Sequence, residues 1–279
     1  MTTALNAAEA DRVLKSAHRA MWALGDYAAI ASEVIPHLGA DLAEACGVRR
    51  GMRVLDVAAG PGNAAIPAAL TGASVVASDL TPELLEAGRR EAARRGAELE
   101  WQQADAEALP FADGEFDVVM SCVGVMFAPH HQASASELIR VCRPGGTIGL
   151  ISWTPQGFVG EMLATMKPYL APPPAGAQPP PLWGQEEHVS ALFGDRVTDL
   201  TMSRRTVRVD CFATPEEFRD HFKTCYGPTV AAYRGIAADP ERVAALDHAL
   251  ADLARRHDRG TTSTVMDWEY LLLTARRRS

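Results

Sequence analysis

The stretch from residue 53 to residue 153 alternates short β-branched runs with longer segments rich in Ala, Leu, Glu and Arg. The strand-like runs are RVLDV, SVVASD, ELEWQQ, FDVVMSCV and TIGLISW, and the segments between them have a helical composition. Near-continuous apolar strands separated by helices are typical of a mostly parallel sheet that is covered on both faces. The alternation therefore predicts a doubly wound α/β fold.

Helix boundaries in this stretch carry clear start and stop residues. Thr81 is a suitable N-cap, Pro82 suits the first helical position, and Glu83 adds an acid to the first turn. Gly96 follows two arginines, as expected at a helix end. Pro67 falls early in the preceding helix, where it either removes a backbone hydrogen bond or displaces the helix start.

The rest of the chain has a different rhythm. Its beginning reads as helices, a proline-rich stretch from residue 171 to residue 181 reads as a stiff extended connector, and two further capped helices follow. The predicted regions are an N-terminal helical cover at 1–50, a ligand-binding core at 51–154, an inserted cap at 155–192 and 211–260, and final strands at 193–210 and 264–277.

Composition excludes several classes of function. With 279 residues and 47% apolar residues, the chain can bury roughly 75% of its unfolded surface, enough for a large core and a cleft. Its 27 basic and 35 acidic residues give a net charge of −8, which argues against gripping nucleic acid. No run is apolar enough to span a bilayer, and the N-terminus lacks an apolar signal core, so we expect a cytoplasmic protein. The five cysteines form no CxxC pair, which indicates small buried thiols and no metal site.

A glycine-rich turn follows the first strand-like run. The segment VLDVAAGPGN, residues 54–63, leads from a strand into a helix. Glycines at Gly60 and Gly62 allow a ligand to approach the backbone, and the free N–H groups of the following helix favour a carboxylate or a phosphate. The same residues also satisfy the dinucleotide pattern GxGxxG/A, so the turn alone leaves the ligand open.

Three acids occupy corresponding positions at strand ends. Asp56 lies in the first strand, Asp79 ends the second, and Asp105 follows the third. In a doubly wound sheet these ends meet at the crevice where ligands bind, and an acid after the second strand can accept from ribose hydroxyls. Taken singly, Asp79 and Asp105 are each also explained as helix caps. Together the three indicate a ligand site.

The successive motifs VLDVAAGPGN, SDLTPELLEAGR, QADAEALPFADGEFDVVMS and ELIRVCRPGGTIGL resemble those of class I S-adenosylmethionine-dependent methyltransferases of the ubiquinone/menaquinone-biosynthesis type. The resemblance runs from about residue 53 to residue 153. It rests especially on Leu109-Pro110-Phe111 and on the Pro144-Gly145-Gly146 turn. It implies a Rossmann-like, seven-stranded sheet whose last strand is antiparallel, with the strand at 266–276 beside the strand at 206–210.

The resemblance also implies a cofactor, S-adenosyl-L-methionine, with S-adenosyl-L-homocysteine as product. An acidic pocket suits the cationic sulfonium, and Ala58 departs from the glycine that many members have. The residues that the resemblance assigns to the cofactor are Asp56, Ala58, Gly60, Gly62 and Asn63 at the methionine half, Asp79 at the ribose, Leu80 and Ala106 with Asp105 at the adenine, and Ser121 near the amino group.

Methyl transfer from a sulfonium needs alignment, exclusion of water and sometimes a base. Histidine suits removal of a hydroxyl proton near neutral pH. His130 and His131 follow the fourth strand where the crevice opens, and we favour His131, although a helix cap explains either residue as well. His18 on the N-terminal helix is a further candidate. The fourth strand ends without the Asn/Asp-Pro-Pro-aromatic motif of enzymes that methylate base or glutamine amino groups.

Acceptor choice must come from segments outside the shared core. Their aromatic residues are most simply explained by helix packing, but together they could form an apolar lid over a planar acceptor. The candidates for substrate binding are Trp22, Tyr27, Phe158 and Tyr226.

The sequence therefore predicts methyl transfer to oxygen or carbon of a small, apolar or aromatic metabolite. One alternative is a non-catalytic protein that binds S-adenosylmethionine or S-adenosylhomocysteine in regulation or assembly. An NAD(P)-dependent oxidoreductase is the other alternative, disfavoured by Asp56 within the strand end and by the lack of a Tyr-x-x-x-Lys pair. The expected partner is a small molecule, and the sequence does not indicate an oligomeric state.

Overall fold

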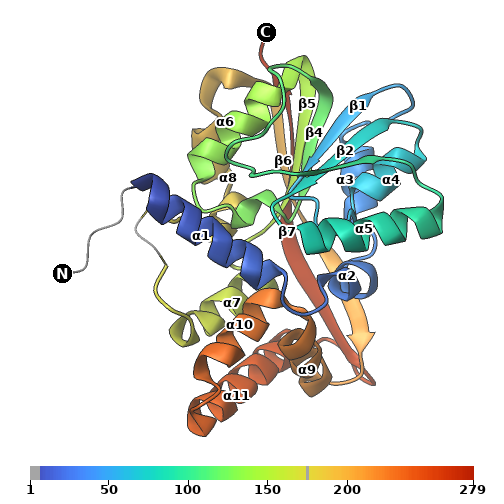
Figure 1. Ribbon diagram of the computed structural model, residues 1–279. Coiled ribbons are helices and arrows are strands. Elements are labelled where there is room, and N and C mark those ends of the chain that lie inside the picture. The colour runs from blue at the N-terminus through green and yellow to red at the C-terminus, as the bar shows by residue number, and fades with distance from the viewer. Residues whose placement is uncertain (1–6, 174–175) are drawn as a thin grey trace.

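A seven-stranded sheet forms the centre of the computed structural model, which describes residues 7–173 and 176–279 (Figure 1). The strand order is β3-β2-β1-β4-β5-β7-β6. Only β7 runs antiparallel to its two neighbours, which confirms the predicted doubly wound sheet with an antiparallel last strand. The strands are β1 (Arg53–Val57), β2 (Ser74–Asp79), β3 (Glu100–Gln103), β4 (Phe116–Cys122), β5 (Cys142–Trp153), β6 (Val197–Phe212) and β7 (Thr264–Arg277).

The central strand β1 explains why the sheet is buried on both faces. It lies between β2 and β4, with Val54 paired to Val75 on one side and to Val118 on the other. All three valines are buried, as expected for parallel strands covered by helices on both sides. The carboxyl ends of β1, β2 and β4 therefore meet at one edge of the sheet.

Helices cover the two faces as the alternation predicts (Figure 1). One side carries α3 (Leu38–Ala45), α4 (Ala65–Leu70) and α5 (Pro82–Arg95), and the other carries α6 (His131–Val141) and α8 (Glu186–Phe193). Thr81 precedes α5 in an extended conformation, and Gly96 ends it with φ +67°. Pro67 is the third residue of the short α4, and because Ile66 and Ala68 both donate to the carbonyl four residues earlier, the proline leaves out the one helical bond between theirs.

The remaining helices lie beyond the carboxyl edge of the sheet. They are α1 (Ala7–Trp22), α2 (Tyr27–Ala29) with a π-helical turn at Ile30–Val34, α7 (Phe158–Met166), α9 (Pro215–Cys225), α10 (Gly227–Ile236) and α11 (Pro240–His257). α1 crosses the front of the molecule, and α7, α9, α10 and α11 gather below it (Figure 1). Parts of two predicted segments, residues 1–6 of the N-terminal cover and 174–175 of the connector, lie outside the described residues.

The predicted strand at 193–210 begins later than predicted, because Gly194–Arg196 form a helical turn before β6. β6 is one strand of 16 residues with two irregularities in its pairing to β7. Val209 of β6 pairs with Met266 of β7. Within the described ranges, no helix is long and apolar enough to cross a membrane.

Candidate functional site

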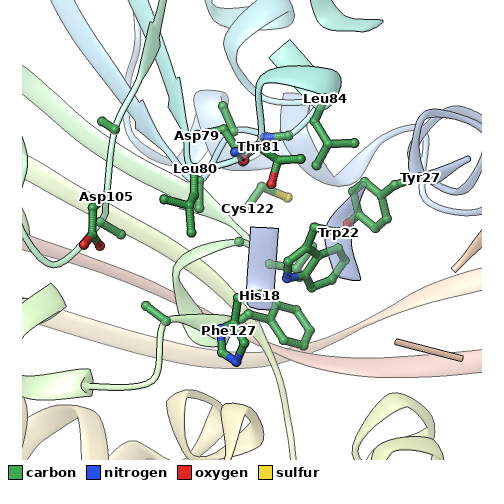
Figure 2. Close-up of a pocket in the computed structure, with 18 of the residues that line it drawn as sticks. His18, Trp22, Tyr27, Asp79, Leu80, Thr81, Leu84, Asp105, Cys122 and Phe127 are labelled. Carbon is green, nitrogen blue, oxygen red and sulfur yellow. Dashed lines mark hydrogen bonds between the residues drawn. The ribbon is translucent and has the colours of Figure 1, made fainter. Parts of the chain in front are cut away.

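A cavity opens at the carboxyl ends of β1, β2 and β4, beneath α1 (Figure 2). Its empty space is about 770 Å³ with the open mouth included. The loops that follow β1, β2, β3 and β4 form its floor, and one face of α1 together with Tyr27 forms its roof. Figure 2 shows Asp105 at one end of this cavity and Tyr27 at the other.

Asp79 links the floor of the cavity to the glycine-rich turn. Its Oδ2 accepts from the Gly60 N–H at 2.8 Å and its Oδ1 from the Thr81 N–H at 2.8 Å. Burial raises the pKa of Asp79, and these amides oppose that rise. Each carboxylate oxygen can accept a second hydrogen bond, so the side chain can hold the turn and still bind a hydroxyl pair from the cavity.

The turn itself adopts the backbone conformation that the glycines permit. Gly60 has φ +55° and lines the cavity, and so does Ala58, with φ +53° in place of a glycine. Gly62 has φ +83°, and a Cβ there would lie 2.8 Å from the ring of Trp101, so this glycine accommodates packing behind the turn. Gly62 does not line this cavity, and the structure assigns it a packing role in the loop.

Two predicted cofactor residues lie behind the cavity wall. Asp56 is fully buried and does not line the cavity, and burial, aided by the charge of Asp79, raises its pKa to about 8. The Ser121 hydroxyl donates to the Val57 carbonyl at 2.6 Å and accepts from the Val125 N–H at 2.9 Å. Both residues shape the floor without facing its contents.

Asn63 does face the cavity, and it offers an unused donor. Its Nδ2 is buried and has no hydrogen-bond partner among the described residues. A buried donor of this kind is costly unless a ligand satisfies it. Leu80, Asp105 and Ala106 also line the cavity.

One face of α1 supplies three lining residues, Lys15, His18 and Trp22. They are three and four residues apart and therefore lie on the same side of the helix. Sequence reasoning missed Lys15, although its spacing from the two candidates His18 and Trp22 placed it on their face. Burial lowers the pKa of His18, which favours the neutral imidazole.

Aromatic side chains close the end of the cavity opposite Asp105. The centroid of the Trp22 ring lies 4.8 Å from the ring centroid of Phe127, 5.5 Å from that of Tyr27 and 5.8 Å from that of Tyr226. Burial raises the pKa of both tyrosines, and Tyr226 contacts Trp22 without itself lining the cavity. Three of the four predicted substrate residues thus come together. Phe158 does not, because it stacks on Trp268 at 4.9 Å in the core of the cap.

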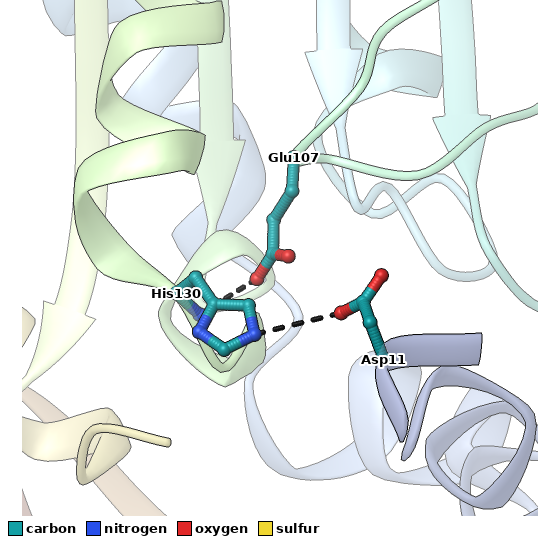
Figure 3. Close-up of side chains that lie close together, drawn as sticks. All are labelled: Asp11, Glu107 and His130. Atoms are coloured by element: carbon teal, nitrogen blue, oxygen red, sulfur yellow. Dashed lines mark hydrogen bonds and ion pairs between the residues drawn. The ribbon is translucent and has the colours of Figure 1, made fainter. Parts of the chain in front are cut away.

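The two histidines favoured from sequence do not line the cavity. His131 is fully buried, and its Nδ1 lies 2.9 Å from Nε2 of His188. Burial, and then the neighbouring histidines, lower the pKa of His131 to about 4. His130 points to Asp11 on α1, 3.5 Å away, and its backbone N–H donates to Glu107 at 2.6 Å (Figure 3). Of the three histidines named from the sequence, only His18 reaches the cavity.

Comparison with known proteins agrees with this geometry. The sequence profile of a methyltransferase domain matches residues 54–146, which include β1, the glycine-rich turn and the strand ends around the cavity. The sequence is 39% identical over 105 residues to the demethylmenaquinone methyltransferase of Thermus thermophilus, covering 37% of this chain and 48% of that protein. The YcgJ protein of Bacillus subtilis shares the fold with a TM-score of 0.58 at 16% identity, covering 87% of this chain and 99% of that one.

A much closer match covers nearly the whole chain. An uncharacterized protein of Mycobacterium tuberculosis is 55% identical over 260 residues, which is 93% of this chain and 94% of that protein. The chain belongs to the class I S-adenosylmethionine-dependent methyltransferase family. The match to the mycobacterial protein extends well beyond residues 54–146, into the segments outside the methyltransferase profile.

Proposed function

We propose that the cavity binds S-adenosylmethionine and transfers its methyl group to oxygen or carbon of a small, apolar or aromatic acceptor. One observation carries the proposal: a single cavity joins the Asp79 carboxylate at one side to an aromatic cluster at the other. The first feature suits a ribose, and the second suits a flat apolar molecule. The methyltransferase profile over the cavity floor supports the same reading.

The lining residues fit the cofactor. The Asp79 oxygens are available to the ribose hydroxyls, and Leu80 lies where an adenine ring would pack. The orphaned Nδ2 of Asn63 suits the methionine carboxylate. Asp105 and Ala106 at the far end suit the edge of the adenine. We assign no direct contact to Asp56, Gly62 or Ser121, because their side chains and backbone lie behind this wall.

When bound, the cofactor supplies a methyl group already activated on a positive sulfur. The chain then has to align the acceptor, exclude water and, for a hydroxyl acceptor, remove a proton. α1 and the aromatic cluster of Trp22, Tyr27, Phe127 and Tyr226 exclude water from the roof. His18 is the lining group suited to accept the proton, because burial favours its neutral form.

The acceptor is inferred from the walls. The aromatic cluster presents ring faces and edges, and Tyr27 is one of the residues that line the cavity. Rings of this kind hold a flat molecule, and the Tyr27 hydroxyl can orient one oxygen on it. An aromatic or enolic hydroxy compound satisfies both conditions. The Thermus thermophilus relative, named as a demethylmenaquinone methyltransferase, supports an acceptor of this kind.

Two measurements test the proposal. Titration calorimetry with S-adenosylhomocysteine, S-adenosylmethionine and NAD should give binding of the first two only. Selective binding of NAD would contradict the proposal and favour an oxidoreductase. S-adenosylmethionine with a deuterated methyl group should then label phenols and hydroquinones in preference to alkylamines. Tight cofactor binding without transfer to any hydroxyl or carbon acceptor would favour a non-catalytic role.

A further inference from the structure

A charged cluster fastens α1 over the cavity. The Lys15 ammonium lies 2.6 Å from Oδ2 of Asp105, 2.9 Å from Oε2 of Glu107 and 2.9 Å from Oδ2 of Asp11. Asp11 belongs to the same helix, whereas Asp105 and Glu107 belong to the loop after β3. One side chain of α1 thus binds two carboxylates of a loop that lines the cavity.

The cluster extends to a third element. Glu107 also accepts from the backbone N–H of His130, the residue before α6, and Asp11 lies 3.5 Å from the His130 imidazole (Figure 3). Asp11, Glu107 and His130 bring their ligand atoms within 4.8 Å of one another, as a metal site would. The Lys15 ammonium already binds both of those carboxylates, so we treat the group as an ion-pair cluster.

Burial makes Lys15 the member on which the others depend. The side chain of Glu107 is 4% exposed and that of Lys15 is 17% exposed. Burial acts to lower the pKa of Lys15, but its hydrogen bonds to Asp105, Asp11 and Glu107 raise it above the ordinary value, so the ammonium is retained. Without it, the nearly buried Glu107 carboxylate would face the carboxylates of Asp11 and Asp105 with no cation between them, an unfavourable arrangement.

Lys15 also shares a helix face with the two residues that roof the cavity. His18 and Trp22 follow it at spacings of three and four residues, and all three line the cavity. The Asp105 carboxylate is held at both oxygens: its Oδ1 accepts from the Glu107 N–H at 2.9 Å, and its Oδ2 binds Lys15. The same ion pair therefore fixes Asp105 at one end of the cavity and the position of α1 above it.

We propose that Lys15 is a positioning residue that couples cofactor binding to the docking of α1. This inference rests on the proposed function, since it takes Asp105 to meet the adenine end of the cofactor. A ligand that binds beside the Lys15–Asp105 pair stabilises the docked helix, and the docked helix in turn strengthens ligand binding, because the coupling between two events is reciprocal. Docking brings His18 and Trp22 over the reacting end.

Hydrogen–deuterium exchange and calorimetry on the full chain test this coupling. In the wild type, S-adenosylhomocysteine should slow amide exchange in peptides that cover α1. In Lys15→Met, α1 should exchange about tenfold faster without ligand, and S-adenosylhomocysteine should bind about tenfold more weakly and no longer slow α1. Lys15→Arg should stay within about threefold of wild type on both measures, because its guanidinium retains the ion pairs.

Arg19→Met is the matched control. Arg19 lies one turn along α1, and its side chain is 45% exposed and pairs with Glu83 at 3.6 Å. Removing this cation should change the α1 exchange rate and the affinity for S-adenosylhomocysteine by less than about twofold each, as expected for an exposed ion pair.

Two results for Lys15→Met would overturn the inference. One is an amide exchange rate in α1 equal to that of the wild type. The other is faster exchange spread equally over β1 and β4, which would mean a loss of global stability. If the wild type does not bind S-adenosylhomocysteine, the proposed function fails and the coupling fails with it. Normal binding by wild type and Lys15→Met alike refutes the coupling alone.

Discussion

Asp79 lies where the glycine-rich turn meets the cavity. Its two oxygens hold the Gly60 and Thr81 amides, and the same oxygens face the cavity. A charge-assisted hydrogen bond contributes about 1.5–3 kcal/mol. A substitution at this residue therefore removes ligand contacts and loosens the turn at the same time.

Asp79→Ala should weaken binding of S-adenosylhomocysteine at least about tenfold, or about 1.4 kcal/mol. Calorimetry measures the change directly. Asp210→Ala is a suitable control, since this exposed carboxylate on β6 pairs only with Arg208 among the described residues. Unchanged affinity in Asp79→Ala would remove Asp79 from the site.

His18→Ala should slow methyl transfer about 100-fold on a hydroxyl acceptor while S-adenosylhomocysteine affinity changes by less than about twofold, because loss of a general base acts on the chemical step. Rates on the acceptor found with the labelled methyl group give the comparison. The sequence favoured His131 as the base. His131→Ala is therefore the contrasting variant: its free energy of unfolding should fall, because His131 is buried, while its rate of methyl transfer should change little. A fully active His18→Ala variant would mean that alignment alone suffices.

At the scale of elements, Trp101 of β3 wedges between α5 and the glycine-rich turn. A Cβ at Gly88 of α5 would lie 2.3 Å from its ring and 2.9 Å from the Pro61 carbonyl oxygen. A Gly-to-Ala change inside a helix ordinarily stabilises it by up to about 1 kcal/mol. At Gly88 the neighbours are a packed ring and backbone, which cannot move aside cheaply, so the steric effect is the larger one.

Gly88→Ala should therefore lower the free energy of unfolding by about 1–3 kcal/mol. Gly235→Ala in α10 should raise it by up to about 1 kcal/mol, because a Cβ there would meet only the Tyr169 carbonyl oxygen, at 3.7 Å. Urea unfolding of both variants gives the two signs. A stabilised Gly88→Ala variant would show that the Trp101 ring is free to shift.

The helices and strands were the features of this protein most easily predicted from its sequence. Alternating composition gave the strands from residue 53 to residue 153, and Thr81 and Gly96 marked the helix ends, because such signals are local in the chain. Which face of an element meets the cavity is a property of tertiary packing. Phe158 and Tyr226 looked alike in sequence, yet one stacks in the cap core and the other contacts Trp22.

The residues of the site also divide into those with a signal in the sequence and those without one. The strand-end argument predicted Asp56, Asp79 and Asp105, and the latter two line the cavity, whereas Asp56 lies behind its wall. The ion pairs of Lys15 were not predictable, since their partners lie some ninety residues away and carry no local signal.

At the scale of the molecule, the His131–His188 pair joins α6 to α8 within the folded chain. Burial lowers the pKa of both histidines, that of His131 to about 4 from an ordinary 6.5. Below about pH 6.5 the unfolded chain therefore binds protons at these two histidines that the folded chain does not bind. The stability this contributes is complete above pH 6.5 and is lost as the pH falls toward 4.

The free energy of unfolding should fall between pH 6.5 and pH 4, with His131 contributing a slope of at most about 1.4 kcal/mol per pH unit. Denaturant unfolding at several pH values measures the slope. His131→Phe should flatten it whatever its effect at neutral pH, because the variant cannot take up that proton. An equal slope in His131→Phe and wild type would mean that other groups cause the acid sensitivity.

The place of β7 in the sheet has a consequence for synthesis. β7 lies between β5 and β6, so residues 264–277 must leave the ribosome before either neighbour is paired on that side. Until then the 16-residue β6 has no strand beside it, and unpaired strands are prone to join other chains. The nascent chain therefore passes through a stage in which its sheet is open in the middle, when a chaperone would protect it most.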